Sequence, residues 1–227
     1  MYNYTKFKNK EYDLINPSGL TVGDKIPDVE LLDVNNQKIK ITSLLTKPLI
    51  LETGSITCGM FAGQSNGMNE LAKENSEFNF ALLYVREAHP GKLIQAHKSI
   101  NNKCDLAKQM LNEDDIKKRY VLVDDINGSF HNTLGALPNM IFIINTDCTI
   151  LYKADWNNTV ELKKAMVHLK NNLKAIPQKW DMLPLPNIPI EYRIFKRAGW
   201  DAAFDFIIAM PRLIASHLIG GIKFKSK

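Results

Sequence analysis

The sequence is poor in cysteine and lacks any pattern that would bind a structural metal or build a disulfide framework. Its 227 residues contain three cysteines, Cys58, Cys104 and Cys148. An odd number this small argues against a disulfide-stapled scaffold, and the separations do not match those of zinc ligands. We therefore expect no metal site. In a reducing compartment, cysteines of this kind are either catalytic or inert.

Other signals are absent as well. The first residues contain no apolar stretch typical of a signal peptide, so we expect a cytoplasmic protein. The net charge is +5, but no zinc-finger spacing or RNA-binding aromatic motif accompanies it, so nucleic acid is not expected as a partner. A hydrophobic content of 45% with 23% charged residues argues against disorder and is enough for one good core.

The order of the apolar runs predicts one α/β domain over residues 25–175. Strand patterns at 29–32, 38–41, 48–53, 80–85, 120–123, 140–145 and 149–153 alternate with helical periodicity. The resulting order, β-β-α-β-α-β-α-β-β-α, predicts a mixed central sheet flanked by helices. Residues 1–24 are expected to form a loose N-terminal arm. A proline-rich linker at 176–189 and an amphipathic helical extension at 190–227 are expected to follow.

Cys58 follows a buried strand and a Gly-Ser loop, at the point where a helix is expected to begin. A helix N-terminus offers free N–H groups and the positive end of the helix dipole, and both favour a thiolate. Such sites can lower a thiol pKa from ~8.5 to roughly 3.5–7.5. The alternative is a small buried hydrophobe. We favour a reactive nucleophile.

Polar residues gather where neighbouring parallel strands are expected to end, because the carboxyl ends of such strands share one edge of a sheet. Glu87 and His89 follow the strand at 80–85 and are two positions apart, so both side chains are candidates for one cleft. A glutamate beside a histidine raises its pKa, which would make His89 a proton donor. The hydroxyls of Ser55 and Thr57 would bond the thiolate, pass a proton or cap the helix.

Two further residues stand out near this edge. Glu52 lies six positions before Cys58 on an otherwise apolar strand, and it is either a buried proton relay or a carboxylate bonded to backbone. Pro138 precedes the strand at 140–145. A β-α-β-α-β order followed by proline and a hairpin is the thioredoxin plan, where this proline is cis. We therefore expect a cis bond at Pro138, although trans is commoner in general.

The sequence resembles the iodothyronine deiodinase family within the thioredoxin superfamily, and especially its bacterial, cysteine-containing members. Gly54-Ser55-Ile56-Thr57-Cys58 is similar to the family's Gly-Ser-Cys-Thr-selenocysteine motif, with Cys58 at the selenocysteine position. Tyr84-Val85-Arg86-Glu87-Ala88-His89 is similar to its Tyr-Ile-Glu-Glu-Ala-His. His97 has the position of the histidine that follows the family's insertion. The resemblance covers roughly residues 21–172.

This resemblance implies a thioredoxin-like fold and a reductive deiodinase. Cys58 would attack the iodine of an iodoarene related to iodothyronine or iodotyrosine, and Thr57, Ser55, Glu87, His89 and His97 would handle protons and substrate. No cofactor is implied beyond an external thiol reductant such as thioredoxin or glutathione.

The sequence departs from the family motif and from its relatives in ways that affect the thiol cycle. Ile56 replaces an extra cysteine of the motif, and Phe61 occupies the second position of a Cys-x-x-Cys pair. The resolving thiol is therefore expected to be Cys104, whose predicted helix begins at the same edge of the sheet, or a small-molecule thiol. Cys148 lies in a predicted hairpin turn at the opposite edge and is expected to be inert.

Two other functions fit the pattern. A peroxiredoxin-like peroxidase would use Ser55 as the hydroxyl three residues before Cys58, but Leu51 and Gly59 stand where that class carries prolines. The second alternative is a redox-sensing or binding module without turnover.

The C-terminal extension allows three placements: docked on the domain or on a homodimer mate, lying at a membrane interface, or spanning a membrane. Its apolar runs are interrupted by acidic residues and by Pro211, which disfavours a span of ~20 residues. Basic residues on both sides suit anionic headgroups, which would place the protein peripherally at the inner face of a membrane. They include Arg193, Lys196, Arg197, Lys223 and Lys225.

Overall fold

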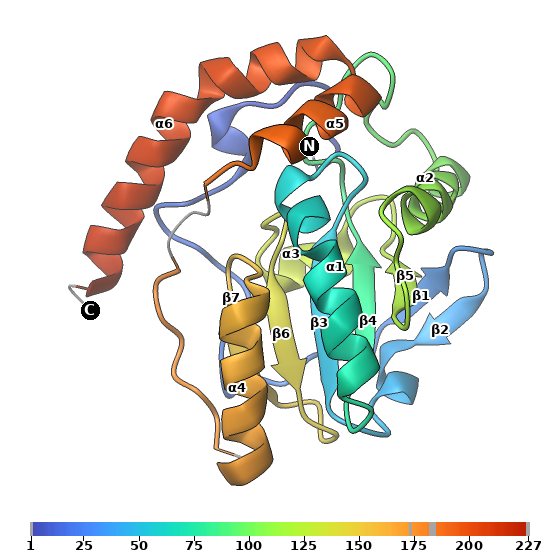
Figure 1. Cartoon of the computed structure of the whole chain (residues 1–227), viewed down its shortest axis with the longest axis vertical. Coiled ribbons are helices and arrows are strands. Elements are labelled where there is room, and N and C mark those ends of the chain that lie inside the picture. The colour runs from blue at the N-terminus through green and yellow to red at the C-terminus, as the bar shows by residue number, and fades with distance from the viewer. Residues whose placement is uncertain (1, 173, 182–184, 226–227) are drawn as a thin grey trace.

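A seven-stranded mixed sheet forms the centre of the molecule in the computed structural model, which describes residues 2–172, 174–181 and 185–225 (Figure 1). The strands run in the order β2-β1-β5-β4-β3-β6-β7. β3, β4 and β5 are parallel, and their other partners are antiparallel. The predicted order of strands and helices along the chain and the mixed central sheet flanked by helices are confirmed. The strands are β1 (Glu30–Asp33), β2 (Lys38–Lys40), β3 (Leu49–Gly54), β4 (Asn79–Tyr84), β5 (Tyr120–Val123), β6 (Ile141–Ile144) and β7 (Ile150–Ala154).

Both faces of the sheet are covered, which explains the nearly continuous apolar runs of β3, β4 and β6. Helices α1 (Gly59–Glu74), α2 (Ile100–Glu113) and α4 (Thr159–Asn172) lie on one face (Figure 1). Helix α3 (Ser129–Leu134) and the N-terminal arm cover the other face, together with the short 3-10 helices η1 (Asn9–Glu11) and η2 (Ile41–Leu44). The alternation of side chains along each strand divides the core into these two layers.

The N-terminal arm is packed rather than loose. The guanidinium group of Arg86 lies 5.0 Å and 5.1 Å from the ring centroids of Tyr4 and Tyr12. It also donates hydrogen bonds to the backbone carbonyls of Tyr2 at 3.1 Å and Glu11 at 2.7 Å. Stacking and hydrogen bonds from one cation thus fix the arm, and Arg86 stands where the related family motif has glutamate.

The peptide bond before Pro138 is trans, so the prediction of a cis bond is wrong. The chain turns just before it, at Gly135 with φ 126° and Ala136 with φ 59°. These two positive φ angles redirect the chain into β6, and the proline keeps the isomer that is favoured by about 0.5–1 kcal/mol. Pro138 still lines the same cavity as Cys58.

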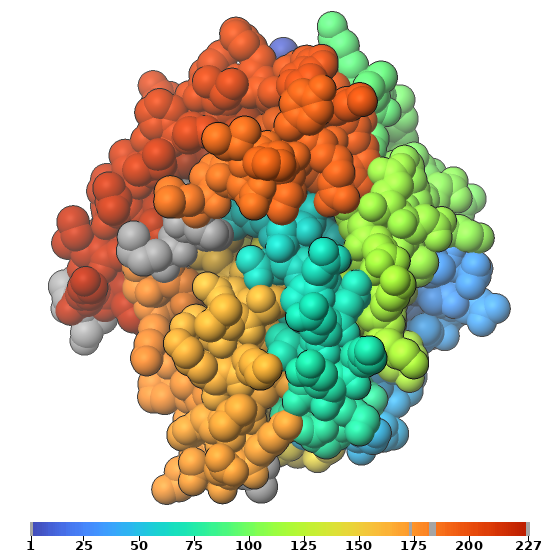
Figure 2. All heavy atoms as spheres, in the orientation of Figure 1, coloured from blue at the N-terminus to red at the C-terminus, as the bar shows by residue number. Residues whose placement is uncertain are grey.

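The C-terminal extension forms α5 (Ile188–Ala198) and α6 (Trp200–Lys225), which lie across the carboxyl ends of the parallel strands (Figures 1 and 2). Arg197 bonds the buried carboxylate of Asp114 at 3.1 Å and 3.2 Å, and Arg193 contacts the same group at 3.0 Å. The carbonyl of Ala198 accepts a hydrogen bond from the Leu93 amide at 2.9 Å. Of the three expected placements, the structure therefore shows the docked one.

We expect Gly54→Ala to lower the free energy of unfolding by about 1–3 kcal/mol, measured by urea denaturation. A Cβ atom at Gly54 would lie 2.5 Å from the Phe61 ring, which is fully buried, so the change overpacks the core. Gly63→Ala is the matched control in α1, because its Cβ would meet only Ile190 at 3.5 Å. That variant should gain up to about 1 kcal/mol through helix propensity. Equal effects of the two changes would contradict this packing account.

Candidate active site

Cys58 is the N-cap residue of α1, directly after the loop that follows β3. Its Sγ atom accepts a hydrogen bond from the backbone N–H of Phe61 at 3.5 Å. The side chain is only 2% exposed. The prediction that a helix begins at Cys58 is confirmed, and the thiol itself occupies the capping position.

The protonation state of Cys58 differs from the sequence-based expectation. Burial raises the pKa of the thiol to about 12, although the helix N–H groups of Phe61 and Met60 act in the opposite direction. The charges of Glu191 and Glu87 raise the pKa further. The predicted stabilisation of a thiolate is therefore wrong for this closed arrangement, because desolvation outweighs the helix terminus.

A cavity of about 250 Å³ lies against Cys58 and is bounded mainly by apolar side chains. The thioredoxin-like domain supplies one side, with Met60, His89, Pro138 and Trp156, and the N-terminal arm adds Phe7 and Tyr12. The C-terminal extension closes the other side, and sequence analysis did not foresee this contribution. Its lining residues include Glu191, Phe206, Met210, Leu213, Ile214, His217 and Leu218.

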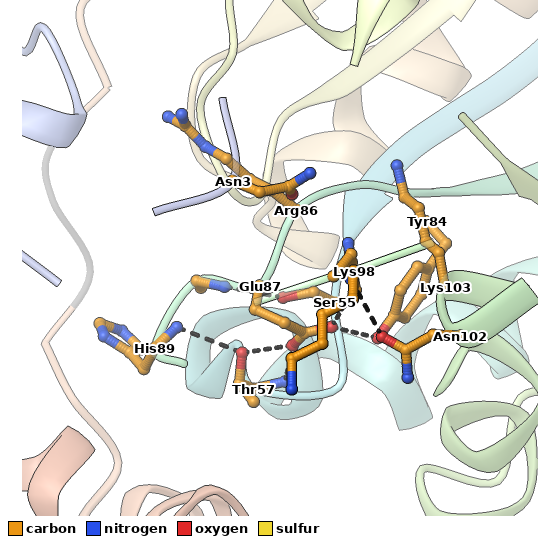
Figure 3. Close-up of polar contacts among 12 residues, drawn as sticks. Asn3, Ser55, Thr57, Tyr84, Arg86, Glu87, His89, Lys98, Asn102 and Lys103 are labelled. Atoms are coloured by element: carbon orange, nitrogen blue, oxygen red, sulfur yellow. Dashed lines mark hydrogen bonds and ion pairs between the residues drawn. The ribbon is translucent and has the colours of Figure 1, made fainter. Parts of the chain in front are cut away.

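Glu87 joins the loop after β3 to the loop after β4 (Figure 3). Its carboxylate accepts hydrogen bonds from the Thr57 hydroxyl at 2.5 Å and the Thr57 amide at 3.2 Å. It also bonds the Tyr84 hydroxyl and, at 2.8 Å, Nε2 of His97. Burial alone would raise the pKa of Glu87, but the contacts with His97, Thr57 and Tyr84 outweigh it and lower the pKa. Glu87 is thus a fixed carboxylate rather than a proton donor.

The two predicted hydroxyl residues connect loops instead of contacting the thiol. The Oγ atom of Ser55 accepts a hydrogen bond from the Ala88 amide at 3.1 Å. Thr57 Oγ1 accepts one from the His89 amide at 3.2 Å while donating to Glu87 (Figure 3). Their role in this structure is to hold the two loops in register beside Cys58.

His89 lines the cavity among aromatic rings. Its ring centroid lies 4.7 Å from that of Phe7, 4.8 Å from Phe206 and 5.7 Å from Phe195. Burial lowers the pKa of His89 to about 4, and the charge of Glu87 opposes this only in part. The expectation that Glu87 makes His89 a protonated donor is wrong, because burial lowers the pKa of His89 by more than the charge of Glu87 raises it. His89 is a neutral imidazole near pH 7.

Glu52 lies outside the cavity, on β3. Its carboxylate pairs with Arg119 and accepts a hydrogen bond from Nδ2 of Asn157 at 3.1 Å. Burial raises the pKa of Glu52 and Arg119 opposes that shift. With both oxygens partnered away from Cys58, the arrangement fits a structural ion pair better than a proton relay.

Cys104 lies on α2 and belongs to the same buried cluster as Cys58. Its sulfur lies 3.8 Å from the carbonyl of Asp33, and both thiols are free. The role of Cys104 as a resolving thiol stays a prediction.

Cys148 lies in the β6–β7 turn. The antiparallel pairing of β3 with β6 puts this turn at the sheet edge opposite Cys58. Among the described residues, no group of three or more histidine, cysteine or acidic side chains is placed to hold a metal ion.

A family model described as iodothyronine deiodinase matches residues 4–166, well over half of the chain. The chain belongs to the iodothyronine deiodinase family. This membership makes the protein an oxidoreductase. The match ends before α5 and α6, so the side of the cavity that these helices build lies outside the family domain.

Solved structures resemble this deiodinase-family chain in fold. A Chlorobium tepidum protein described as a thiol:disulfide interchange protein DsbE is 16% identical with a TM-score of 0.53, covering 66% of this chain and 98% of its own. Peroxidoxin BcpB from Mycobacterium tuberculosis is 16% identical with a TM-score of 0.50, covering 67% and 98%. A thiol peroxidase from Chromobacterium violaceum is 12% identical with a TM-score of 0.50, covering 69% and 91%. These likenesses establish the thioredoxin-like fold. No curated protein matches the sequence.

We expect Glu87→Gln to lower the free energy of unfolding at pH 7 by about 1.5–3 kcal/mol, because an amide replaces the buried carboxylate that is hydrogen-bonded to Thr57, Tyr84 and His97. The pKa of Glu87 is lowered in the folded state. Its contribution is therefore present above the unfolded pKa of about 4.3 and is lost as pH falls through the folded pKa. The difference from wild type in urea denaturation should shrink in acid.

Glu77→Gln provides the control for this prediction, because Glu77 belongs to an exposed pair with Lys170. It should cost less than about 1 kcal/mol. A Glu87→Gln effect that stays constant at every pH would contradict the role assigned to the carboxylate.

Proposed function

We propose that this protein removes iodine reductively from an iodinated aromatic compound, with Cys58 as the nucleophile and an external thiol as reductant. The observation that carries the proposal is the placement of Cys58, in the family motif, against a mainly apolar cavity of about 250 Å³. Aromatic and aliphatic walls suit an iodinated ring, and sulfur is a soft partner for polarisable iodine. The volume lies just below the range of roughly 300–1,000 Å³ for ligand pockets, which favours a single-ring substrate.

The reaction balances without a cofactor. The sulfur of Cys58 attacks iodine, the S–I bond forms and the C–I bond breaks, and the aromatic carbon receives the proton that the thiol gives up. Cys58 is then oxidised to a sulfenyl iodide. One external thiol displaces iodide and forms a mixed disulfide, and a second releases Cys58 as the thiol. The presence of Phe61 at the second motif position supports reductants from outside the chain, such as thioredoxin or glutathione.

Reduction of peroxides is the weaker alternative. That class carries prolines where this chain has Leu51 and Gly59. A redox-sensing module without turnover is the non-enzymatic alternative, and a substrate-independent disulfide between Cys58 and Cys104 would favour it.

Iodide release from iodinated phenols, tyrosines and thyronines in the presence of dithiothreitol tests the proposal. We expect release by the wild type and by Cys148→Ser, whose thiol lies at the opposite sheet edge, and none by Cys58→Ser. Release that persists in Cys58→Ser would contradict the assignment. Absence of release, with Cys58-dependent consumption of hydrogen peroxide, would favour the peroxidase. Absence of both activities would favour the sensor.

We also propose that the outward face of α6 rests on an anionic membrane surface. Within the described residues, α6 is long and apolar enough to cross a membrane, with a mean hydropathy of 1.5 over its most apolar window, of which 28% is buried. Its exposed apolar side chains lie three, four or seven residues from one another, as in 204/208, 207/214, 214/218 and 219/222, and therefore form one stripe. They are Trp200, Phe204, Ile207, Ile208, Ile214, Leu218, Ile219 and Ile222.

Charge and position favour a lipid surface as the occupant of this stripe. Exposed Lys196 on α5 and exposed Lys223 and Lys225 at the end of α6 flank it with positive charge. Ile214 and Leu218 belong to the stripe and also line the cavity beside Cys58. An apolar substrate dissolved in the bilayer would therefore meet the cavity at this face.

Flotation with liposomes tests this surface in the full-length protein. We expect wild type to float with phosphatidylserine-containing vesicles at low salt, and a Phe204→Ser/Ile208→Ser double variant to bind at least tenfold less. Val160→Ser/Val167→Ser removes two exposed apolar residues from α4 and is the matched control, which should bind like wild type. Equal binding by all three proteins, or a salt-stable dimer that buries the stripe, would contradict the membrane assignment.

A further inference from the structure

The C-terminal extension brings a carboxylate into the cavity beside Cys58. Glu191 lies in the first turn of α5, whose N-cap residue Asn187 accepts a hydrogen bond from the Ile190 amide. Its carboxylate lies directly over Gly59, because a Cβ atom there would be 2.1 Å and 2.5 Å from its two oxygens. Gly59 directly follows Cys58, where peroxiredoxins have a proline. Because glycine has no side chain, the Glu191 carboxylate can occupy this space.

Glu191 has no basic partner among the described residues. The Oε2 atom is buried without a hydrogen bond, and the arginines of the same helix, Arg193 and Arg197, are paired with Asp114 instead. Burial alone raises the pKa of Glu191 to about 7. The carboxyl group can therefore both hold and release a proton at neutral pH.

The other titratable groups around the cavity do not share this property. Burial raises the pKa of Tyr12 to about 12, lowers that of His89 to about 4 and lowers that of His217. Glu87, close to Cys58, is held as a carboxylate by its hydrogen bonds. Among these side chains, Glu191 has the pKa best suited to acid–base chemistry at Cys58 near pH 7.

We infer that Glu191 is the acid–base group of the Cys58 site, supplied by chain outside the family domain. The inference rests on the proposed function. The ionised carboxylate takes the thiol proton as the S–I bond forms, and the resulting acid gives it to the aromatic carbon as the C–I bond breaks. Cys58 becomes the sulfenyl iodide, the substrate becomes the deiodinated arene, and Glu191 returns to its starting state. With a peroxide, the same proton would pass to the departing oxygen.

A simple electrostatic role for Glu191 predicts the opposite effect. A fixed negative charge beside a thiol disfavours the thiolate, and Glu191 raises the pKa of Cys58 in this way. Removing the charge would then make Cys58 more reactive. Removing an acid–base group makes it less reactive at neutral pH. The sign of the change therefore distinguishes the two roles.

The test is the pH profile of Cys58 alkylation by iodoacetamide, with labelling quantified at the Cys58 peptide by mass spectrometry. In wild type the alkylation rate should rise with increasing pH, and the midpoint of this acidic limb should lie near 7, the pKa of Glu191. Glu191→Gln should lose this limb and react about 10²-fold more slowly at pH 8. Asp205→Asn, a charge removal on α6 outside the cavity lining, should follow the wild-type profile.

A rate that is unchanged or increased in Glu191→Gln would overturn the inference. A lower urea midpoint of Glu191→Gln would show that the change disturbs the docking of α5. In that case the Glu191→Asp variant is used for the test instead. Aspartate keeps a carboxylate, so the acidic limb should survive at a reduced rate, and its disappearance would contradict the assignment. Alkylation needs no iodoarene. Loss of the limb thus supports Glu191 even if no iodide is released, and iodide release that continues in Glu191→Gln overturns Glu191 alone.

Discussion

Exclusion of water from the Cys58 thiol is the constraint on which the rest of the site depends. A helix N-terminus and its N–H groups normally favour a thiolate, yet here the cover formed by α5 and α6 leaves the side chain 2% exposed and raises its pKa to about 12. The same cover creates the apolar cavity and places Glu191 in it. A site of this kind keeps the thiol protonated at rest and couples its reaction to a neighbouring acid–base group.

On the side of the site opposite α5 and α6, two adjacent residues of the loop after β4, Arg86 and Glu87, hold the surrounding segments in place. The register of β3 with β4 pairs Gly54 with Tyr84, so the two following loops leave the sheet side by side. Glu87, in the loop after β4, joins them through buried hydrogen bonds with Thr57 of the loop after β3, with Tyr84 at the end of β4 and with His97. Arg86, the preceding residue, holds the N-terminal arm, which in turn contributes Phe7 and Tyr12 to the cavity. Packing far from Cys58 thereby sets the shape of the space in front of it.

Much of the domain could be predicted from sequence because its strands and helices are specified by residues that are close together in the chain. The apolar runs of β3, β4 and β6 were sufficient to predict the order of elements along the chain, and the Gly-Ser turn before Cys58 was sufficient to predict the start of α1. Properties that depend on distant partners were missed. His89 owes its lowered pKa to burial among Phe7, Phe195 and Phe206, which come from three separate segments. Glu191 lies in a helix that no motif connects to Cys58.

The titration of Cys58 in the resting protein tests the central claim most directly. Thiolate absorbance in the ultraviolet would be followed across pH for wild type, with Cys58→Ser subtracted to remove the signals of tyrosine and of the other two cysteines. The account predicts no thiolate step at or below the pKa of an ordinary thiol, ~8.5, because the covered thiol has a pKa of about 12. A step between roughly 3.5 and 7.5 would show that the helix N-terminus prevails over burial, and would contradict the account.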